Sequence, residues 1–368
     1  MANLAYALSS SMLGPSLPAI IISLSLDAWG VGAIASAVAI GFFSVLPGGV
    51  LADRSGKKEL MLTGLFIEML GYSLVGVSKS FEPLLLSLVL FGIGAGFWEV
   101  AVSAFIPDTF ADNPSGPMNI LHSMWGVGGF LGPLLVGLVI SASRDWHPSF
   151  LVAAALLVAA QMAILLLKEG GRQASGSPRP LSALSSVPKG AIVALALEWG
   201  VESGLYMYLP LLLESERGFG TFDASAALGI LLLTIAAGRI VWSRLGEWMG
   251  MANTIRISGI MAGLSVLATA VMAGPYTFPL ILSTGFFISS LAPTILAYIG
   301  DRTASSGTGT AIGLTLSAAS IGGAVIPASS ALIAGWAKLS IAFIFLGVLL
   351  MPIFFLMKGT SGAGGHGH

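Results

Sequence analysis

The sequence predicts an all-α membrane protein with twelve transmembrane helices arranged as two pseudo-symmetric six-helix bundles. Of its 368 residues, 55% are hydrophobic and only 9% are charged, and the mean hydropathy is +0.93. A soluble domain carries about 25% charged residues, so this composition indicates a protein embedded in lipid. The other two observations are a series of long apolar runs and an internal repeat.

Twelve apolar runs are long enough to cross a bilayer, because a spanning helix needs about 20 apolar residues. Lipid offers no partner for an open backbone group, so each run is predicted to be a helix. The runs are expected at 3–25, 30–52, 59–77, 83–107, 116–141, 148–167, 190–213, 223–246, 255–273, 276–299, 308–335 and 338–357.

An internal repeat indicates two similar halves. Asp53 and Glu247 lie 194 positions apart (247 minus 53), and so do Gly56 and Gly250. Parallel six-span repeats related by an axis along the membrane normal are one known way to build a transporter. We therefore expect an N-terminal bundle, a polar cytoplasmic linker rich in Gly, Ser and Pro, a C-terminal bundle and a disordered tail, at 1–167, 168–189, 190–358 and 359–368.

The basic residues predict the orientation, because cytoplasmic loops of membrane proteins are enriched in Lys and Arg. With the N-terminus inside, eleven basic residues fall in inside loops and four in outside loops, so both termini are expected in the cytoplasm. No basic segment precedes the first run, so we expect no cleaved signal peptide, with little or no cytoplasmic segment before the first span. The inside set is Arg54, Lys57, Lys58, Lys168, Arg172, Arg179, Lys189, Arg244, Arg256, Arg302 and Lys358; the outside set is Lys79, Arg144, Arg217 and Lys338.

Composition also argues against several functional classes. The net charge of −1 argues against nucleic acid as a partner, and the absence of cysteine excludes disulfides. With one intramembrane histidine and no paired metal-ligand motif, we expect no enzymatic activity, no cofactor and no metal site. His366 and His368 are interpreted as part of a floppy tail rather than as metal ligands.

A short basic loop reading GVLADRSGKK, from Gly49 to Lys58, joins the second and third runs. It resembles the loop signature of the major facilitator superfamily, G-x-x-x-D-(R/K)-x-G-(R/K)-(R/K), and all key positions match. The resemblance implies the major facilitator fold and alternating access, in which one six-helix bundle rocks against the other around a central site. The gating loop would then comprise Gly49, Asp53, Arg54, Gly56 and Lys57, with Glu247 at its degenerate second copy.

The same resemblance implies a latch. In relatives, the counterpart of Asp53 faces the N-terminus of the eleventh span, where the helix dipole is positive, here near Thr308 and Thr310. Glu247 would face the fifth span in the same way, near Ser115. These contacts would hold the cytoplasmic side closed.

Charged groups inside a span cost several kcal/mol unless they face a cavity or a partner, so each is a functional candidate. The candidates are Glu68, Glu99, Glu198, Glu202, Arg239 and the histidine His122. Glu68 shares a helix face with small residues and is interpreted as a helix-packing acid. Arg239 is interpreted as structural, or as neutralising a nearby acid.

Glu99 and His122 are expected at similar depths, about 12 Å and about 9 Å from the cytoplasmic ends of adjacent spans at 1.5 Å per residue. A direct hydrogen bond between them is therefore possible. A carboxylate beside an imidazole in a low dielectric can take up and release a proton. The alternative is a static polar clamp between two helices.

The seventh run places Glu198, Glu202 and Tyr206 on one helical face. Two carboxylates one turn apart repel if both ionise, so at least one should hold a proton or a partner. Glu202 is expected to line the central cavity near the midplane, where it would contact the substrate and take part in proton coupling with Glu99 and His122. For Glu198, a cavity role and a role in pairing two helices both stay open.

The segment MNILHSMWGVGGFLGP, with the preceding GIGAGFWEV, looks like the fucose–galactose–proton symporter group. By that resemblance Glu99 would carry the coupling proton, and Asn119 and His122 would approach the sugar. Met118 replaces the usual Leu. The same GVGGFLGP also looks like the Gly-Pro motif of drug/proton antiporters, although Val136 interrupts that motif and Leu88 stands where those proteins carry an Arg.

Trp98, Trp125 and Trp199 each neighbour one of the intramembrane polar residues. Aromatic faces suit the apolar face of a sugar, so these residues, with Tyr206 and Glu198, are predicted to contact the substrate. Packing at a helix–helix contact is the alternative for each tryptophan.

The leading functional prediction is a secondary active transporter in the cell (plasma or inner) membrane that moves a small polar solute, such as a sugar, by proton-coupled alternating access. The coupling ion is H+ or Na+, and a monomer in the bilayer is expected. The alternative is a proton-coupled exporter of drugs or amphipathic metabolites, which predicts a mostly apolar cavity. A membrane enzyme and a non-transporting receptor are the remaining classes, and the substrate and its direction stay open.

Overall fold

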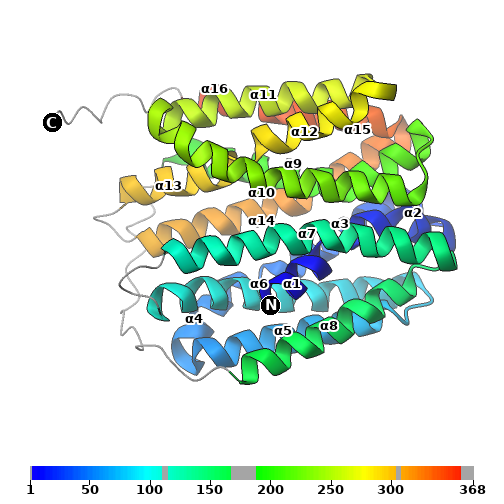
Figure 1. The fold of residues 1–368 in the computed structure, drawn as a ribbon, viewed down its shortest axis with the longest axis horizontal. Coiled ribbons are helices and arrows are strands. Elements are labelled where there is room, and N and C mark those ends of the chain that lie inside the picture. Colours follow the sequence, from blue (N-terminus) through cyan, green and yellow to red (C-terminus); the bar gives the residue numbers. More distant parts are fainter. Residues whose placement is uncertain (1, 110–114, 167–187, 304–307, 358–368) are drawn as a thin grey trace.

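The computed structural model describes residues 2–109, 115–166, 188–303 and 308–357 of the chain. These residues are helical apart from short turns, and no strand occurs among them. Figure 1 shows the long helices lying side by side along one direction. The helices are α1 (Ala2–Ser10), α2 (Leu13–Leu24), α3 (Ala28–Phe42), α4 (Val45–Ser55), α5 (Lys57–Val75), α6 (Phe81–Thr109), α7 (Ser115–Ser143), α8 (His147–Leu165), α9 (Lys189–Arg217), α10 (Thr221–Met249), α11 (Met251–Val271), the 3-10 helix η2 (Gly274–Tyr276), α12 (Thr277–Ile288), α13 (Leu291–Thr303), α14 (Thr308–Trp336), α15 (Leu339–Leu350) and α16 (Ile353–Leu356).

In the described part of the chain, ten helical segments are long and apolar enough to cross a membrane. Four of these segments combine a broken pair: α1 with α2, α3 with α4, α12 with α13, and α15 with α16. Two further long helices, α5 and α9, carry acids in their interior and pack against the others. Together these elements are consistent with the twelve predicted runs, in the same order.

Three of the breaks follow from proline. Proline has no backbone N–H and removes the helical hydrogen bond to the carbonyl four residues earlier. Pro15 thus frees the carbonyl of Ser11, where α1 gives way to α2. Pro47 likewise cannot donate to the carbonyl of Phe43 at the break between α3 and α4. Pro293 cannot donate to the carbonyl of Ser289 at the break between α12 and α13. Residues at the first two breaks line the central cavity described below.

The helices of the two halves follow the same order. Lys57 and Met251, the first residues of α5 and α11, lie 194 positions apart (251 minus 57). Each follows a glycine with a positive φ, 98° at Gly56 and 77° at Gly250. Side chains are strained at such backbone angles, so the signature loop and its degenerate copy both need glycine at this turn.

Small residues let the two halves approach closely. Helix α7 packs against α10, α3 against α14, and α2 against α9. A Cβ added at Gly14 of α2 would collide with the backbone oxygen of Tyr206 on α9, and one at Gly335 of α14 would collide with Ala28 of α3. In Figure 1, α9 to α13 occupy the upper part, and α4 to α6 with α8 the lower part. The division into bundles 1–167 and 190–358 stays a prediction, since residues 167–187 and 358–368 lie outside the described ranges.

We call the end of the molecule that holds the Gly56 turn the loop end, and the opposite one the far end. At the far end of the first half, the indole N–H of Trp146 donates to Ser23 Oγ at 3.0 Å. The Nε2 atom of His147 lies 2.9 Å from the Ser78 carbonyl oxygen, and its Nδ1 lies 2.5 Å from Asp145 Oδ1. These contacts tie the start of α8 to the ends of α2 and α5.

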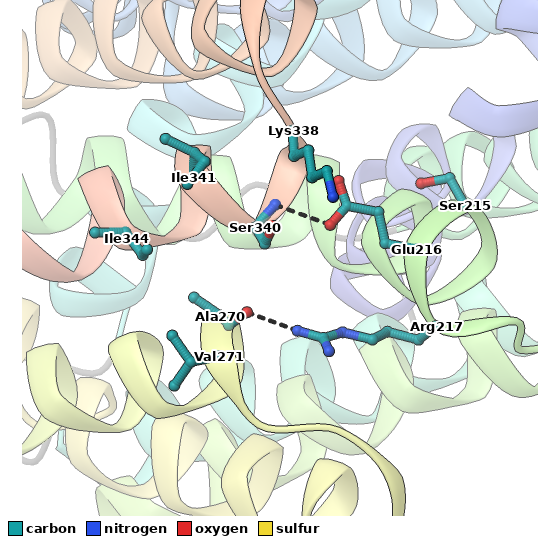
Figure 2. A pocket seen from close by; sticks show the side chains of 9 residues that line it. All are labelled: Ser215, Glu216, Arg217, Ala270, Val271, Lys338, Ser340, Ile341 and Ile344. Atoms are coloured by element: carbon teal, nitrogen blue, oxygen red, sulfur yellow. Dashed lines mark hydrogen bonds between the residues drawn. The ribbon is translucent and has the colours of Figure 1, made fainter.

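The far end of the second half is tied by charged side chains around an open pocket (Figure 2). The Glu216 carboxylate accepts hydrogen bonds from the backbone N–H groups of Leu339 at 2.5 Å and Ser340 at 3.2 Å, and so caps α15. Arg217 Nη2 donates to the Ala270 carbonyl oxygen at 2.6 Å, at the end of α11. The start of α15 and the end of α11 are thus both tied to α9.

Candidate functional site

A cavity of about 180 Å³ lies between the two halves. Helices α1 to α3 and α6 contribute one side, and α9 and α14 contribute the other. None of the described lining side chains is charged: most are apolar or aromatic, with serine hydroxyls and one tyrosine among them. The lining residues are Ser10, Ser11, Leu13, Gly14, Ala35, Val38, Ala39, Phe42, Phe91, Trp199, Ser203, Tyr206, Met207, Ser320, Gly323 and Pro327.

Two of the four serine hydroxyls that line the cavity donate to backbone carbonyl groups. Ser11 Oγ donates to the Leu8 carbonyl oxygen and Ser320 Oγ to the Leu316 carbonyl oxygen, each at 3.0 Å. With its proton engaged in its own helix, each serine presents lone pairs to a solute. The aromatic wall is formed across the halves, because the rings of Phe42 and Trp199 lie 6.1 Å apart.

Arg239 of α10 is the cation of an intramembrane charge cluster. It interacts electrostatically with Glu99 of α6. It also interacts with Glu198 of α9, which in turn interacts with Glu202 one turn away. We call Glu99, Glu198, Glu202 and Arg239 the Arg239 cluster. One acid comes from the first half and two come from the second, so the cluster spans both halves.

The Arg239 cluster is incompletely paired. Glu198 is only 1% exposed, yet its Oε2 atom has no hydrogen-bond partner in the described structure. The Nε atom of Arg239 is likewise buried without one. Buried polar groups without a hydrogen-bond partner are costly, so the Arg239 cluster is a candidate functional feature rather than a packing one.

Tyr206 connects the cavity to the Arg239 cluster. Its ring lines the cavity, and its hydroxyl donates to Glu202 Oε1 at 2.5 Å. A solute that touches Tyr206 is therefore one hydrogen bond away from an intramembrane carboxylate.

A family model described as the Major Facilitator Superfamily matches residues 1–284. The chain belongs to the major facilitator superfamily. Among curated proteins, it is 26% identical over 301 residues to Multidrug resistance protein 1 of Bacillus subtilis (strain 168), covering 77% of this chain and 76% of that protein. It is 22% identical over 310 residues to Multidrug resistance protein 2 of the same organism, covering 80% and 77%.

Solved structures show the same fold. The nucleoside transporter NupG matches with a TM-score of 0.82 at 14% identity, covering 97% of each chain. The E. coli fucose:proton symporter FucP matches with a TM-score of 0.68 at 17% identity, covering 98% of this chain and 97% of that one. The chain is thus a multi-pass membrane transporter with the major facilitator fold, as the signature loop predicts.

The transporter brings only some of the predicted substrate-binding residues to its cavity. Trp199 and Tyr206 line it, and Glu202 is bonded to Tyr206. Trp98 does not line it: the side chain is 1% exposed, and its Nε1 donates to Asn3 Oδ1 at 3.3 Å. Trp125 packs against the apolar core and is also absent from the lining. For Trp98 and Trp125 this placement matches the packing alternative.

Several predicted residues of the transporter fall on side chains outside the described set. Asn119 and His122 lie on α7, but their side chains are not described, so the predicted Glu99–His122 bond stays a prediction. The same holds for the side chains of Asp53, Arg54 and Glu247, and hence for the latch. Of the gating loop, Gly49 lies on α4 with open space beside it, Gly56 forms the turn, and Lys57 begins α5.

Sequence reasoning missed most of the cavity lining of the transporter. The only sequence signal for Ser10 and Ser11 was their position shortly before Pro15. The only signal for Phe42 was its position shortly before Pro47. Of the two interpretations of Arg239, the structure favours the neutralising one, because it lies among acids from both halves. Its charge inside a span was the only available signal. Among the described residues, no group of three or more potential metal ligands gathers.

Proposed function

We propose that the transporter exports amphipathic organic molecules by proton-coupled alternating access. The observation that carries this proposal is the cavity lining, which is mostly apolar and aromatic with a few hydroxyls and without a charged side chain among the described residues. Such a surface suits a molecule with a large apolar part and few polar groups. The names of the Bacillus subtilis relatives, which are multidrug resistance proteins, support the same substrate class.

Coupling would work by competition for Arg239. Ionised Glu99 from one half and ionised Glu198 from the other both favour contact with this single cation. Protonating one acid neutralises it and removes its attraction for the arginine, which can then move towards the other acid. This movement changes the equilibrium between the two orientations of the halves. The cycle therefore follows the protonation of the cluster.

Tyr206 would make the solute and the proton compete. Ionised Glu202 is a strong acceptor for the Tyr206 hydroxyl, and a protonated carboxyl is a weaker one. Protonation of Glu202 would release the Tyr206 ring, which then occupies space in the cavity. A bound solute would hold Tyr206 against Glu202 and favour the ionised acid. Proton uptake and solute release would thus be linked, as an exporter requires.

The geometry of the cycle follows from the two halves. We propose that residues 1–167 and 190–358 move as two bundles, joined by the linker 168–189. The close contacts at Gly14 and Gly335 support closure of the far end in this conformation. The distribution of basic residues supports a cytoplasmic position for the loop end and both termini. A monomer suffices, because both sides of the cavity come from one chain.

Proton-coupled sugar import is the second candidate. The serine hydroxyls, the Trp199 ring and the likeness in fold to a fucose:proton symporter favour it. The cavity of about 180 Å³ is below the range of roughly 300–1,000 Å³ for drug-sized ligands, so in this conformation it admits only a small solute or part of a larger one.

Transport in proteoliposomes decides between the two candidates. Purified protein would be reconstituted with an imposed pH gradient, and the uptake of a fluorescent lipophilic cation and of radiolabelled hexoses would be compared. We expect gradient-driven movement of the amphipathic dye, slowed at least tenfold in Tyr206→Ala and Glu202→Gln. The exposed-acid variant Glu82→Gln is the matched control and should behave as the wild type. Gradient-driven hexose accumulation without dye movement would overturn the exporter proposal.

A further inference from the structure

Glu68 on α5 is a buried carboxyl group that the cavity and the Arg239 cluster do not use. Its side chain is fully buried, with 0% exposure. Its Oε1 atom accepts a hydrogen bond from Ser9 Oγ of α1 at 2.6 Å, while its Oε2 atom has no hydrogen-bond partner in the described structure. A carboxyl group with one donor and one orphaned oxygen is an unusual choice for a purely structural position.

The packing of α5 does not require a carboxyl group there. Helices α5 and α6 meet through small residues: a Cβ on Gly94 would collide with the backbone of Glu68 and Gly64. This close approach confirms the helix packing predicted for this face. In the second half, the position 194 residues later (68 plus 194) is Ala262, which is also fully buried. An alanine therefore serves the same backbone geometry, and the acid of the first half needs another explanation.

The groups around Glu68 can accept and donate protons, and none of those described is a cation. From α1, Ser9 bonds to it and Tyr6 interacts with it electrostatically. From its own helix, Tyr72 interacts with it and donates to the Ser9 carbonyl oxygen at 2.5 Å. Tyr6 also interacts with Glu99, so one tyrosine is in electrostatic contact with both acids.

The position of this group links it to the transport cycle. Helix α1 ends at Ser10, where Pro15 breaks the first span, and Ser10 lines the cavity directly after Ser9. A short helix separated by a break can shift when the halves move. Such a shift would alter the Ser9 bond to Glu68 and the separation of Tyr6 from the two acids.

We propose that Glu68 is a second proton-carrying site of the transporter, which exchanges a proton with Glu99 through the Tyr6 hydroxyl. In the described conformation Glu68 Oε2 has no hydrogen-bond partner, so the step requires the shift of α1 to bring the Tyr6 hydroxyl to that oxygen. The Glu68 carboxyl then gives its proton to the Tyr6 oxygen while Tyr6 gives its own proton to the Glu99 carboxylate. The result is an ionised Glu68 and a protonated Glu99, with Tyr6 unchanged. The site rests on the proposed proton coupling and adds a second carrier to it.

The variant Glu68→Gln tests the proposal, because glutamine keeps the shape and the Ser9 bond but carries no exchangeable proton. The number of protons moved per solute and the pH profile of transport would be measured in proteoliposomes. We expect Glu68→Gln to lose one proton per cycle and to shift the pH profile while downhill transport persists. A purely structural Glu68, protonated throughout, would leave both readouts at wild-type values and overturn the proposal.

Two further measurements keep the test independent of activity. Infrared difference spectra between acid and alkaline pH should contain a carboxyl band that is missing in Glu68→Gln, and Ser9→Ala should shift the pH at which that band changes. Thermal unfolding of each variant checks that the protein folds. If the wild-type protein moved no protons, that result would contradict the proposed function rather than the role of Glu68. The infrared measurement would then test Glu68 alone, and a Glu68 band that does not change with pH would overturn the proposal for this residue.

Discussion

At the far end, both halves of the transporter join the ends of neighbouring helices through side-chain hydrogen bonds, but the side chains differ in chemistry. In both, the start of the last passage is tied to the end of the first passage. The end of the third passage is tied to the last passage in the first half and to the first passage in the second half. Trp146 and Ser23 of the first half correspond, 194 positions on, to Ser340 and Arg217 of the second. The first half uses an indole and a histidine ring, whereas the second uses a carboxylate and a guanidinium group.

This difference indicates that the two halves share backbone geometry at corresponding positions, while the chemistry of their side chains differs. Glycine stands at the same turn in both halves, at Gly56 and Gly250. The intramembrane charges are not repeated: 194 positions after Glu99 stands Pro293, and 194 before Arg239 stands Val45. The asymmetry that the proposed coupling needs would therefore lie in the side chains, on backbone geometry that the halves share.

The largest expected effect comes from removing the one cation of the Arg239 cluster. Arg239→Met would leave the buried acids Glu99 and Glu198 without their positive neighbour, and an uncompensated buried charge costs several kcal/mol. We expect loss of gradient-driven transport and a lowered unfolding temperature. Restoring neutrality with Glu198→Gln should recover stability without coupling. Arg244→Met, an exposed arginine on the same helix, is the control and should leave both properties unchanged.

Alanine substitutions at the two repeated turn glycines should lower the stability of the transporter by different amounts. Both positions have positive φ, and a side chain there costs about 1–3 kcal/mol. Gly56→Ala should be slightly the more harmful, because its Cβ would also have to displace the end of the flexible Glu59 side chain, while Gly250→Ala has open space. The unfolding temperatures in detergent give the order. Equal losses would show that the crowding at Gly56 does not matter.

Replacing one far-end residue in each half should lower the stability by smaller amounts, which differ between the halves. Arg217→Gln removes a cation from the carbonyl end of α11, a contact of about 0.3–1 kcal/mol. His147→Gln in the first half removes two ring contacts, to Asp145 Oδ1 and to the Ser78 carbonyl oxygen, so its loss of stability should be the larger. The unfolding temperatures of both variants in detergent would measure the order. A smaller loss for His147→Gln than for Arg217→Gln would contradict this ranking.

The smallest effect concerns Asp145 in the turn before α8. Partial burial raises the pKa of Asp145, but hydrogen bonds from the His147 side chain and backbone outweigh it and hold the pKa below its usual value of 3.8. A lowered pKa means that the stabilising contribution is complete above the usual value and is lost as the pH falls through the lowered one. Below pH 4 the wild type should therefore approach the stability of Asp145→Asn. A difference that widens with acid would contradict this sign.

The fold was predictable because lipid imposes long apolar helices and because the repeat is visible in the sequence. The passages came out in the predicted order. The break at Ser11 could have been predicted from Pro15, but prolines such as Pro133 sit inside the unbroken helix α7, so proline alone does not decide. Tertiary contacts determine which prolines interrupt a span.

The site was only partly predictable. Trp199 and Tyr206 were found because they share a helix with intramembrane acids. Ser203 and Phe91 were missed, since whether a hydroxyl or an aromatic ring faces a cavity depends on the rotation of its helix, which an almost uniformly apolar sequence does not reveal. The partners of Arg239 depend on how α10 packs between the halves, and no local pattern encodes that. The expected sugar contacts of Asn119 and His122 stay predictions.

The most direct test of the central claim is proton release on solute binding. Purified transporter in weakly buffered detergent solution would be mixed with an amphipathic solute that it binds, and the pH would be followed with an indicator dye. If Tyr206 links the cavity to Glu202, binding should release protons from the wild type and markedly fewer from Glu202→Gln or Tyr206→Phe. Binding without proton release, or equal release from the three proteins, would contradict the claim that cavity and Arg239 cluster act together.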